Sequence, residues 1–256
     1  MPASKATYVY CVIAAPRRPR VSRAARGLAG MGPVRVLDVD RELFVAVADA
    51  PLSRYGEAEI SRRLTDLDWV SRAAVAHQAV IESFLNQTAV LPLKLFTIFT
   101  SDARAVEHIA AQRTRIGSLV KRVANHHEWG VRVMLDRGAS KAPAARPKVV
   151  AKSGAAYLNR KKAQRDSATE FAQRARETVA GLYDRLEQRA RIARRRAASD
   201  LTTKSGPLLL DAAFLVPHSR EATFKALAAR EARTLSGQGY RLSISGPWPP
   251  YSFVQD

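Results

Sequence analysis

The sequence predicts an α+β fold in two domains, each a ferredoxin-like or modified ferredoxin-like sandwich, with a long helical insertion in the second. The length of 256 residues suits one large domain or two small ones, and 46% apolar residues suffice for a packed core. Runs rich in β-branched and aromatic residues alternate with stretches whose apolar residues recur every three or four positions. We therefore expect an N-terminal domain over residues 1–100 and a C-terminal domain over residues 101–256.

The first half of the chain predicts the order β-α-β-β-α-β, which is the split βαβ pattern of ferredoxin-like sandwiches. The link between its second and third strands is short enough for a hairpin. Pro92 indicates that the fourth strand lies at an edge or contains a bulge, because proline has no N–H to donate to a ladder. The strands are expected over residues 8–14, 34–39, 43–48 and 90–99, and the helices over 21–28 and 60–85.

The second half predicts the order α-β-α-β-α-β. Its long helix has a heptad stripe that starts at Phe171, which we expect to be packed. The stripe is thin because of its alanine content. Residues 137–152 contain few large apolar side chains and predict a loop or linker. The helices are expected over residues 102–123, 154–198 and 219–236, and the strands over 129–135, 208–216 and 240–244.

Positive charge is concentrated in the second half. The whole chain has a formal net charge of +19, and residues 137–206 alone hold 18 Lys and Arg against 6 Asp and Glu, a net +12. Such a basic segment could lie along nucleic acid phosphates, and a nucleic-acid-binding regulator is therefore the alternative function. Few aromatic side chains accompany it for base stacking, so nucleic acid is the less favoured partner and a solvated, partner-facing helix the preferred interpretation.

Several classes of protein are disfavoured by what the sequence lacks. Cys11 is the single cysteine, so no disulfide or cysteine-based zinc site can form within one chain, which fits the cytoplasm. The sequence has no apolar run long enough to span a membrane, and no phosphate-loop, nucleophile-elbow or HExxH motif. His77 is expected to be a buried, hydrogen-bonded core residue. We therefore predict a protein that is not an enzyme, with no cofactor and no metal.

The closing segment SGPWPPYSFVQD, residues 245–256, has an unusual composition, and we call it the aromatic–proline tail. Its three prolines fix φ and favour an extended, polyproline-like path. Its aromatic side chains are then available either to pack across the domain seam or to dock onto a partner. The candidates for partner contact or seam packing are Trp248, Tyr251 and Phe253 of the tail, together with Arg194, Arg195 and Arg196 of the basic segment.

Five segments, in order along the chain, together resemble the gas vesicle protein GvpF/GvpL family. They are the helical segment with His77 and Glu82, VLPLKLFTIF at 90–99, EWGVRV at 128–133, SGAAYL at 153–158, and SGPWPPYSFV at 245–254. The sequence departs from the family pattern at Lys94, where Arg is usual, at Leu95-Phe96-Thr97, where F-G-T is frequent, and at Cys11, where glycine is common.

This resemblance implies an accessory or minor structural protein of gas vesicles, the hollow protein-walled flotation compartments of some microorganisms. It implies two α+β domains and no known catalytic activity or cofactor. Expected partners are the small hydrophobic shell protein and other accessory proteins, and the expected location is the cytoplasm and the gas vesicle. The protein would then bind these partners and promote vesicle assembly.

Overall fold

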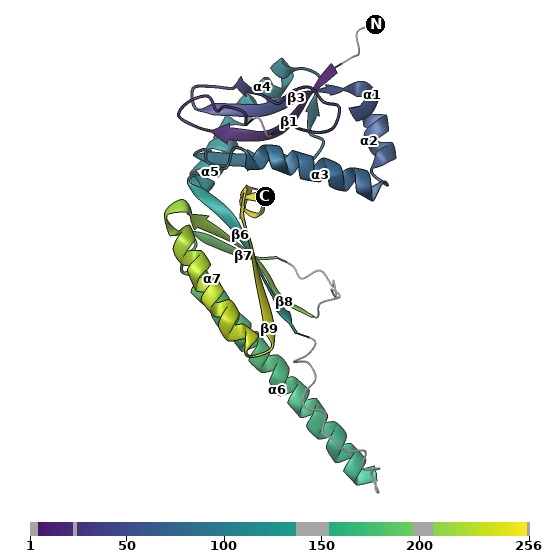
Figure 1. Cartoon of the computed structure of the whole chain (residues 1–256), viewed down its shortest axis with the longest axis vertical. Helices are drawn as coiled ribbons and strands as arrows, with labels where there is room; N and C mark the ends of the chain where they lie inside the picture. The colour runs from purple at the N-terminus through teal and green to yellow at the C-terminus, as the bar shows by residue number, and fades with distance from the viewer. Residues whose placement is uncertain (1–4, 23–24, 137–153, 197–206, 255–256) are drawn as a thin grey trace. The chain divides into compact units, whose positions relative to one another are not determined.

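The computed structural model describes residues 5–22, 25–136, 154–196 and 207–254 as a mixed α/β fold with two antiparallel sheets (Figure 1). The chain divides into two compact units, one of Met1–Glu128 with Pro247–Asp256 and the other of Trp129–Gly246. Helices α4 (Asp102–Ala111) and α5 (Arg113–Val123) contact strands of the first sheet and so belong to the first unit. The units therefore divide after residue 128, whereas the sequence suggested a boundary near residue 100.

The sheet of the first unit has the order β2-β3-β1-β4, with β5 also paired to β1. The hairpin expected from the sequence is present, since β2 and β3 pair antiparallel with Val36 opposite Ala46. β4 is the last strand of this order, as Pro92 indicated, and Pro92 lies opposite Cys11 of β1. The strands are β1 Lys5–Ala14, β2 Arg35–Asp38, β3 Leu43–Pro51, β4 Ala89–Pro92 and β5 Ile98–Phe99.

The helices of the first unit are shorter than the sequence predicted. The stretch expected over residues 60–85 is divided, because the Asp66 side chain accepts a hydrogen bond of 3.0 Å from the Trp69 N–H and so caps a new helix. The helix expected over 102–123 is likewise divided, at Gln112. The helices that precede α4 are α1 Leu52–Tyr55, α2 Glu57–Arg63 and α3 Leu67–Glu82.

Two further predictions for the first unit are wrong. The described part of residues 21–28 contains no helix, because Gly27 takes φ +70° and the Leu28 N–H donates to the Tyr10 hydroxyl at 3.2 Å instead of to a helical carbonyl. The single strand expected over residues 90–99 is instead β4, a turn and β5. Phe96 interrupts it by adopting a left-handed φ of 65°.

The second unit consists of a sheet in the order β7-β8-β6-β9 with two long helices, α6 and α7, which run side by side (Figure 1). Alternate residues of β6, from Trp129 to Leu135, pack into one core with Leu182 of α6 and Phe224 of α7. The Arg185 guanidinium links the two helices by donating to both carboxylate oxygens of the buried Glu231, at 3.1 and 2.8 Å. The elements are β6 His126–Leu135, α6 Gly154–Glu187, β7 Ile192–Arg195, β8 Leu208–Pro217, η1 His218–Arg220, α7 Glu221–Ser236 and β9 Tyr240–Trp248.

The long helix expected over residues 154–198 ends at Glu187, and part of the predicted helix is a strand. The backbone N–H groups of Arg191 and Arg196 donate to carbonyls of β8, both at 2.8 Å, and β7 between them pairs antiparallel with β8. Phe171 is 37% exposed rather than packed, because the buried stripe of α6 begins only at Ala175. The loop expected over residues 137–152 lies outside the described residues.

The aromatic–proline tail differs from the extended path that its prolines suggested. β9 continues through Pro247 to Trp248, which is possible because it is the last strand in its sheet order. After two prolines the chain forms a helical turn, α8, at Tyr251–Val254. No helix within the described ranges is long and apolar enough to cross a membrane.

Candidate functional site

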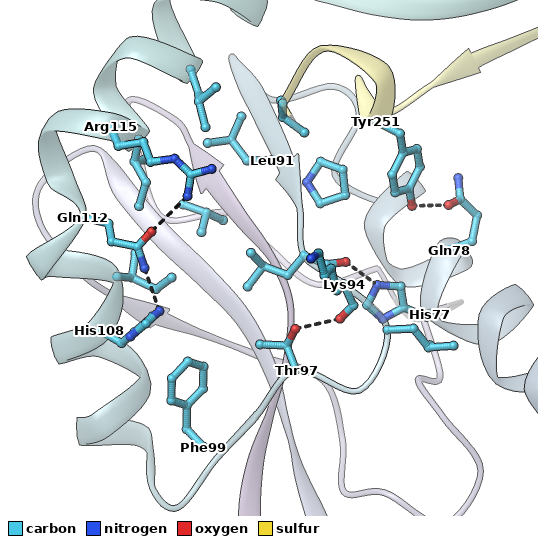
Figure 2. Close-up of a pocket in the computed structure, with 18 of the residues that line it drawn as sticks. His77, Gln78, Leu91, Lys94, Thr97, Phe99, His108, Gln112, Arg115 and Tyr251 are labelled. Atoms are coloured by element: carbon cyan, nitrogen blue, oxygen red, sulfur yellow. Dashed lines mark hydrogen bonds between the residues drawn. The ribbon is translucent and has the colours of Figure 1, made fainter. Parts of the chain in front are cut away.

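A cavity of about 690 Å³ lies in the first unit, at the edge of the sheet formed by β4 (Figure 2). Its walls come from α3, from β4 and the turn that follows it, from α4 and α5, and from α8. This volume is in the range of pockets that bind small molecules or the side chains of a partner segment. Much of the lining is aliphatic: Leu91, Leu93, Ile109, Ile116, Leu119 and Val254.

His77 lies at one side of the cavity and is fully hydrogen bonded. Its Nε2 is 3.2 Å from the Leu93 carbonyl oxygen, which can only accept, so Nε2 carries the hydrogen. Nδ1 then accepts from the Tyr8 hydroxyl at 2.7 Å, and the Tyr8 oxygen accepts from the Phe96 N–H at 3.3 Å. Burial lowers the pKa of His77 and raises the pKa of Tyr8, so both side chains are neutral. The prediction of a buried, hydrogen-bonded core histidine is confirmed.

These bonds fix the turn between β4 and β5, which carries Lys94 to the cavity wall. Thr97 closes the turn, because both its N–H and its hydroxyl donate to the Lys94 carbonyl, at 3.2 and 2.7 Å. Phe96 stacks on Trp69 of α3 with 5.0 Å between ring centroids and 7° between ring planes. The stack offsets the cost of the left-handed backbone at Phe96, a position where the family pattern noted above has glycine.

The opposite wall is a chain of polar side chains on α4 and α5, seen at the left of Figure 2. Arg115 donates from Nη1 to the Gln112 side-chain oxygen at 3.3 Å, and the Gln112 amide donates to Nε2 of His108 at 2.6 Å. His108 in turn lies against the Phe99 ring, 5.0 Å between centroids. Because Nε2 of His108 accepts a hydrogen bond, this arrangement requires that nitrogen to be unprotonated.

The charged residues that line the cavity are of one sign. Lys94 and Arg115 both line it and both are exposed, and no aspartate or glutamate is among its lining residues. The remaining polar groups are amides, hydroxyls and imidazoles. Chemically, the cavity offers an aliphatic surface bordered by cations, and its polar groups do not form a nucleophile–base pair.

The aromatic–proline tail closes one end of the cavity. The Tyr251 hydroxyl hydrogen bonds to the Gln78 side-chain oxygen on α3. The Glu128 carboxylate accepts from the Ser252 N–H at 2.7 Å and from the Ser252 hydroxyl at 2.8 Å. Phe253 is fully buried, and its carbonyl accepts from Arg122 of α5 at 3.2 Å. Residues 251–254 therefore pack within the first unit.

The candidate residues named from the sequence are divided between the two units. In the first unit, Tyr251 lines the cavity, Phe253 is fully buried, and Trp248 is 36% exposed at the end of β9. The arginines belong to the second unit, where Arg194 and Arg195 lie on β7 and Arg196 follows it.

Arg194 and Arg195 lie on opposite faces of β7, because successive residues of a strand point to opposite faces. The Arg195 guanidinium lies over the Tyr183 ring, 4.4 Å from its centroid, whereas Arg196 pairs with Asp211 at 3.3 Å. The sequence had placed all three on a basic helix.

Sequence reasoning did not identify the polar wall of the cavity. His108, Gln112 and Arg115 are spaced four and three residues apart, the spacing that places side chains on one helical face. That spacing alone does not distinguish a cavity wall from a solvated surface. The deciding information is the position of α4 and α5 beside β4, which is a tertiary contact.

Comparison with known proteins gives a consistent result over nearly the whole chain. The model of the family described as gas vesicle synthesis protein GvpL/GvpF matches residues 6–255. The chain is 32% identical over 260 residues to gas vesicle protein L of Streptomyces sp. (strain CB03234), covering 99% of this chain and 94% of that protein. It is 26% identical over 277 residues to gas vesicle protein L2 of Halobacterium salinarum, covering 99% and 92%.

Two solved structures share the fold. The crystal structure of GvpF from Anabaena sp. PCC7120 matches with a TM-score of 0.70 and 16% identity, covering 99% of this chain and 97% of that one. GvpF from Microcystis aeruginosa matches with a TM-score of 0.68 and 18% identity, covering 98% and 99%.

These matches bear directly on the two functions that the sequence left open. They associate the chain with gas vesicles, they point to no known enzyme family, and they give no support to the nucleic-acid alternative. The family model and the first relative together cover almost every residue. The chain therefore belongs to the GvpL/GvpF family of gas vesicle proteins.

Proposed function

We propose that the chain is a non-catalytic accessory protein that binds the gas vesicle shell protein and other accessory proteins and so promotes vesicle assembly. The observation that carries this proposal is the family match over residues 6–255. An assembling shell protein is hydrophobic, and a partner that covers its apolar segments would keep it from aggregating before it joins the wall.

Two features of the chain support a binding role. The first unit has a cavity with a largely aliphatic lining beside β4, and such a cavity can accept the side chains of another protein. The net charge of +19 favours acidic partners and would speed their association. We also propose that the protein acts in the cytoplasm at the growing vesicle, and that each unit is a modified ferredoxin-like sandwich.

Co-purification tests the proposal. Tagged shell protein, expressed together with this chain, should retain it at low salt and, more weakly, at moderate salt because exposed charges are then screened. A folded, unrelated protein of similar positive charge serves as the control for adhesion by charge alone. Failure of the shell protein and of the other accessory proteins to retain the chain at either salt concentration would reject the proposal.

A further inference from the structure

The cavity at the β4 edge combines two properties that together define a ligand. Its floor is aliphatic, contributed by β4, α4, α5 and α8. Its two charged lining residues, Lys94 and Arg115, are cations on exposed positions of different elements. An aliphatic surface favours apolar side chains, and the cations favour a carboxylate beside them.

Hydrogen bonds fix three parts of the cavity wall. His77 and Tyr8 fix the turn that bears Lys94. The Gln112 amide bridges Arg115 and His108 on the facing wall. Tyr251, fixed to Gln78, forms the end of the cavity. Such preorganisation reduces the entropy that a bound segment would cost.

We propose that this cavity is the docking site for a partner-protein segment that carries both aliphatic side chains and carboxylates. The aliphatic side chains enter the space between α3 and α5, and the carboxylates lie against Lys94 and Arg115. The assignment of this segment to a gas vesicle protein rests on the proposed function, whereas the charge and apolar character of the segment follow from the lining residues alone.

The test uses the full chain and two short labelled peptides, one alternating leucine with glutamate and the other leucine with lysine. Fluorescence anisotropy should show that the glutamate peptide binds at least about tenfold more tightly, since like charges at an interface are costly. The double variant Lys94→Glu, Arg115→Glu should reverse this preference. Lys121→Glu reverses one charge on an exposed residue of α5 that does not line the cavity, and should leave the preference unchanged.

A steric variant tests the location independently of charge. Ala74 lies on an exposed position of α3 and lines the cavity, so Ala74→Trp should fill the space without removing a contact, and binding of the glutamate peptide should fall at least about tenfold. Its neighbour Val75 is 68% exposed and does not line the cavity, so Val75→Trp is the matched control and should bind as the wild type does. Thermal melts establish that both variants are folded.

Equal binding of the two peptides, no binding of either, or equal behaviour of the Ala74→Trp and Val75→Trp variants would overturn the docking proposal. Capture by the shell protein separates this outcome from failure of the proposed function. If the shell protein retains the wild type and Ala74→Trp equally and the peptide results fail, the docking site is wrong and the proposed function stands. If neither the shell protein nor the other accessory proteins retain the wild type while the peptide results hold, the docking site stands and the proposed function is wrong.

Discussion

The Tyr8 hydroxyl of β1 donates a hydrogen bond of 2.7 Å to Nδ1 of His77 on α3, across 69 positions of sequence. The same oxygen accepts from the Phe96 N–H, and the other ring nitrogen of His77 donates to the Leu93 carbonyl. His77 and Tyr8 therefore hydrogen bond to the backbone at Leu93 and Phe96, on either side of Lys94 in the turn that follows β4. The position of Lys94 in the cavity wall depends on this pair.

Removing the Tyr8 hydroxyl should destabilise the first unit by about 1–3 kcal/mol, because it leaves two buried groups without their partner. The Tyr8→Phe variant tests this by urea unfolding. Tyr55→Phe is the control, since the Tyr55 hydroxyl makes one bond, of 2.8 Å, to the Ala29 carbonyl and its loss should cost less. A larger effect of Tyr55→Phe would contradict the role given to Tyr8.

The pH dependence of stability should contain a contribution from His77. Burial lowers the pKa of His77 in the folded protein below its ordinary value of 6.5, so the unfolded chain binds a proton at a higher pH than the folded chain does. The stabilising contribution is thus complete above about pH 6.5 and is lost as the pH falls below it.

Unfolding free energies measured between about pH 7.5 and 5.5, above the range in which most carboxylates titrate, check this prediction. The wild type should lose more stability over this interval than His77→Gln does. Tyr8→Phe keeps the imidazole and should keep a pH-dependent loss. Parallel curves for the wild type and His77→Gln would show that His77 does not contribute.

The left-handed backbone at Phe96 and its stack on Trp69 should be energetically coupled. Phe96→Gly relieves about 1–2 kcal/mol of backbone cost but loses the aromatic contact, which is worth about 0.5–1.5 kcal/mol. The substitution should therefore be less harmful, by about 0.5–1.5 kcal/mol, when Trp69 is already alanine. A double-mutant cycle by chemical unfolding measures this difference. Phe99→Gly, whose ring contacts His108 instead, should show no coupling to Trp69.

The buried Glu128 carboxylate should be needed as a hydrogen-bond acceptor at both of its oxygens. It is 2% exposed and accepts two hydrogen bonds from Ser252. In Glu128→Gln an amide N–H₂ faces one of these donors, so the variant should lose about 1.5–3 kcal/mol of stability. Hydrogen exchange at the Ser252 amide should accelerate in the same variant. Glu57→Gln, at an exposed position of α2, should change stability by less than about 0.5 kcal/mol. Wild-type stability of Glu128→Gln would contradict this role.

Phe253, rather than Trp248, should be the main stabilising aromatic of the tail. Phe253 is fully buried and Trp248 is 36% exposed, so Phe253→Ala should cost about 3–5 kcal/mol. Trp248→Ala should still lower the melting temperature, by a smaller amount. Calorimetry of the two variants measures which one loses more stability. A greater loss of stability for Trp248→Ala would mean that burial does not determine the relative contributions of these two residues.

The local sequence pattern was sufficient to predict the structure where one residue type determines the backbone conformation. Pro92 indicated an edge strand because it cannot donate to a second neighbour, and the structure places β4 last in its sheet order. The hairpin of β2 and β3 followed from alternation and a short link. His77 could be assigned to the core because its neighbours on α3 are apolar.

Pattern failed where a contact with another element decided the outcome. Arg194 and Arg195 are compatible with a helix, and only pairing with Ala213 and Ala212 of β8 makes them part of β7. Phe96 carries no local signal for a left-handed backbone, because the compensating contact is with Trp69. The cavity could not be predicted from the sequence for the same reason, since its walls meet only in the folded unit.

The division of the chain has a consequence for biosynthesis. Because Pro247–Asp256 belongs to the unit that begins at Met1, a ribosome makes all of Trp129–Gly246 before it supplies Phe253 to the core of that unit. During translation, the core of the first unit therefore lacks the Phe253 side chain until that residue leaves the ribosome. A premature stop codon within the second unit would therefore also leave the first one incomplete.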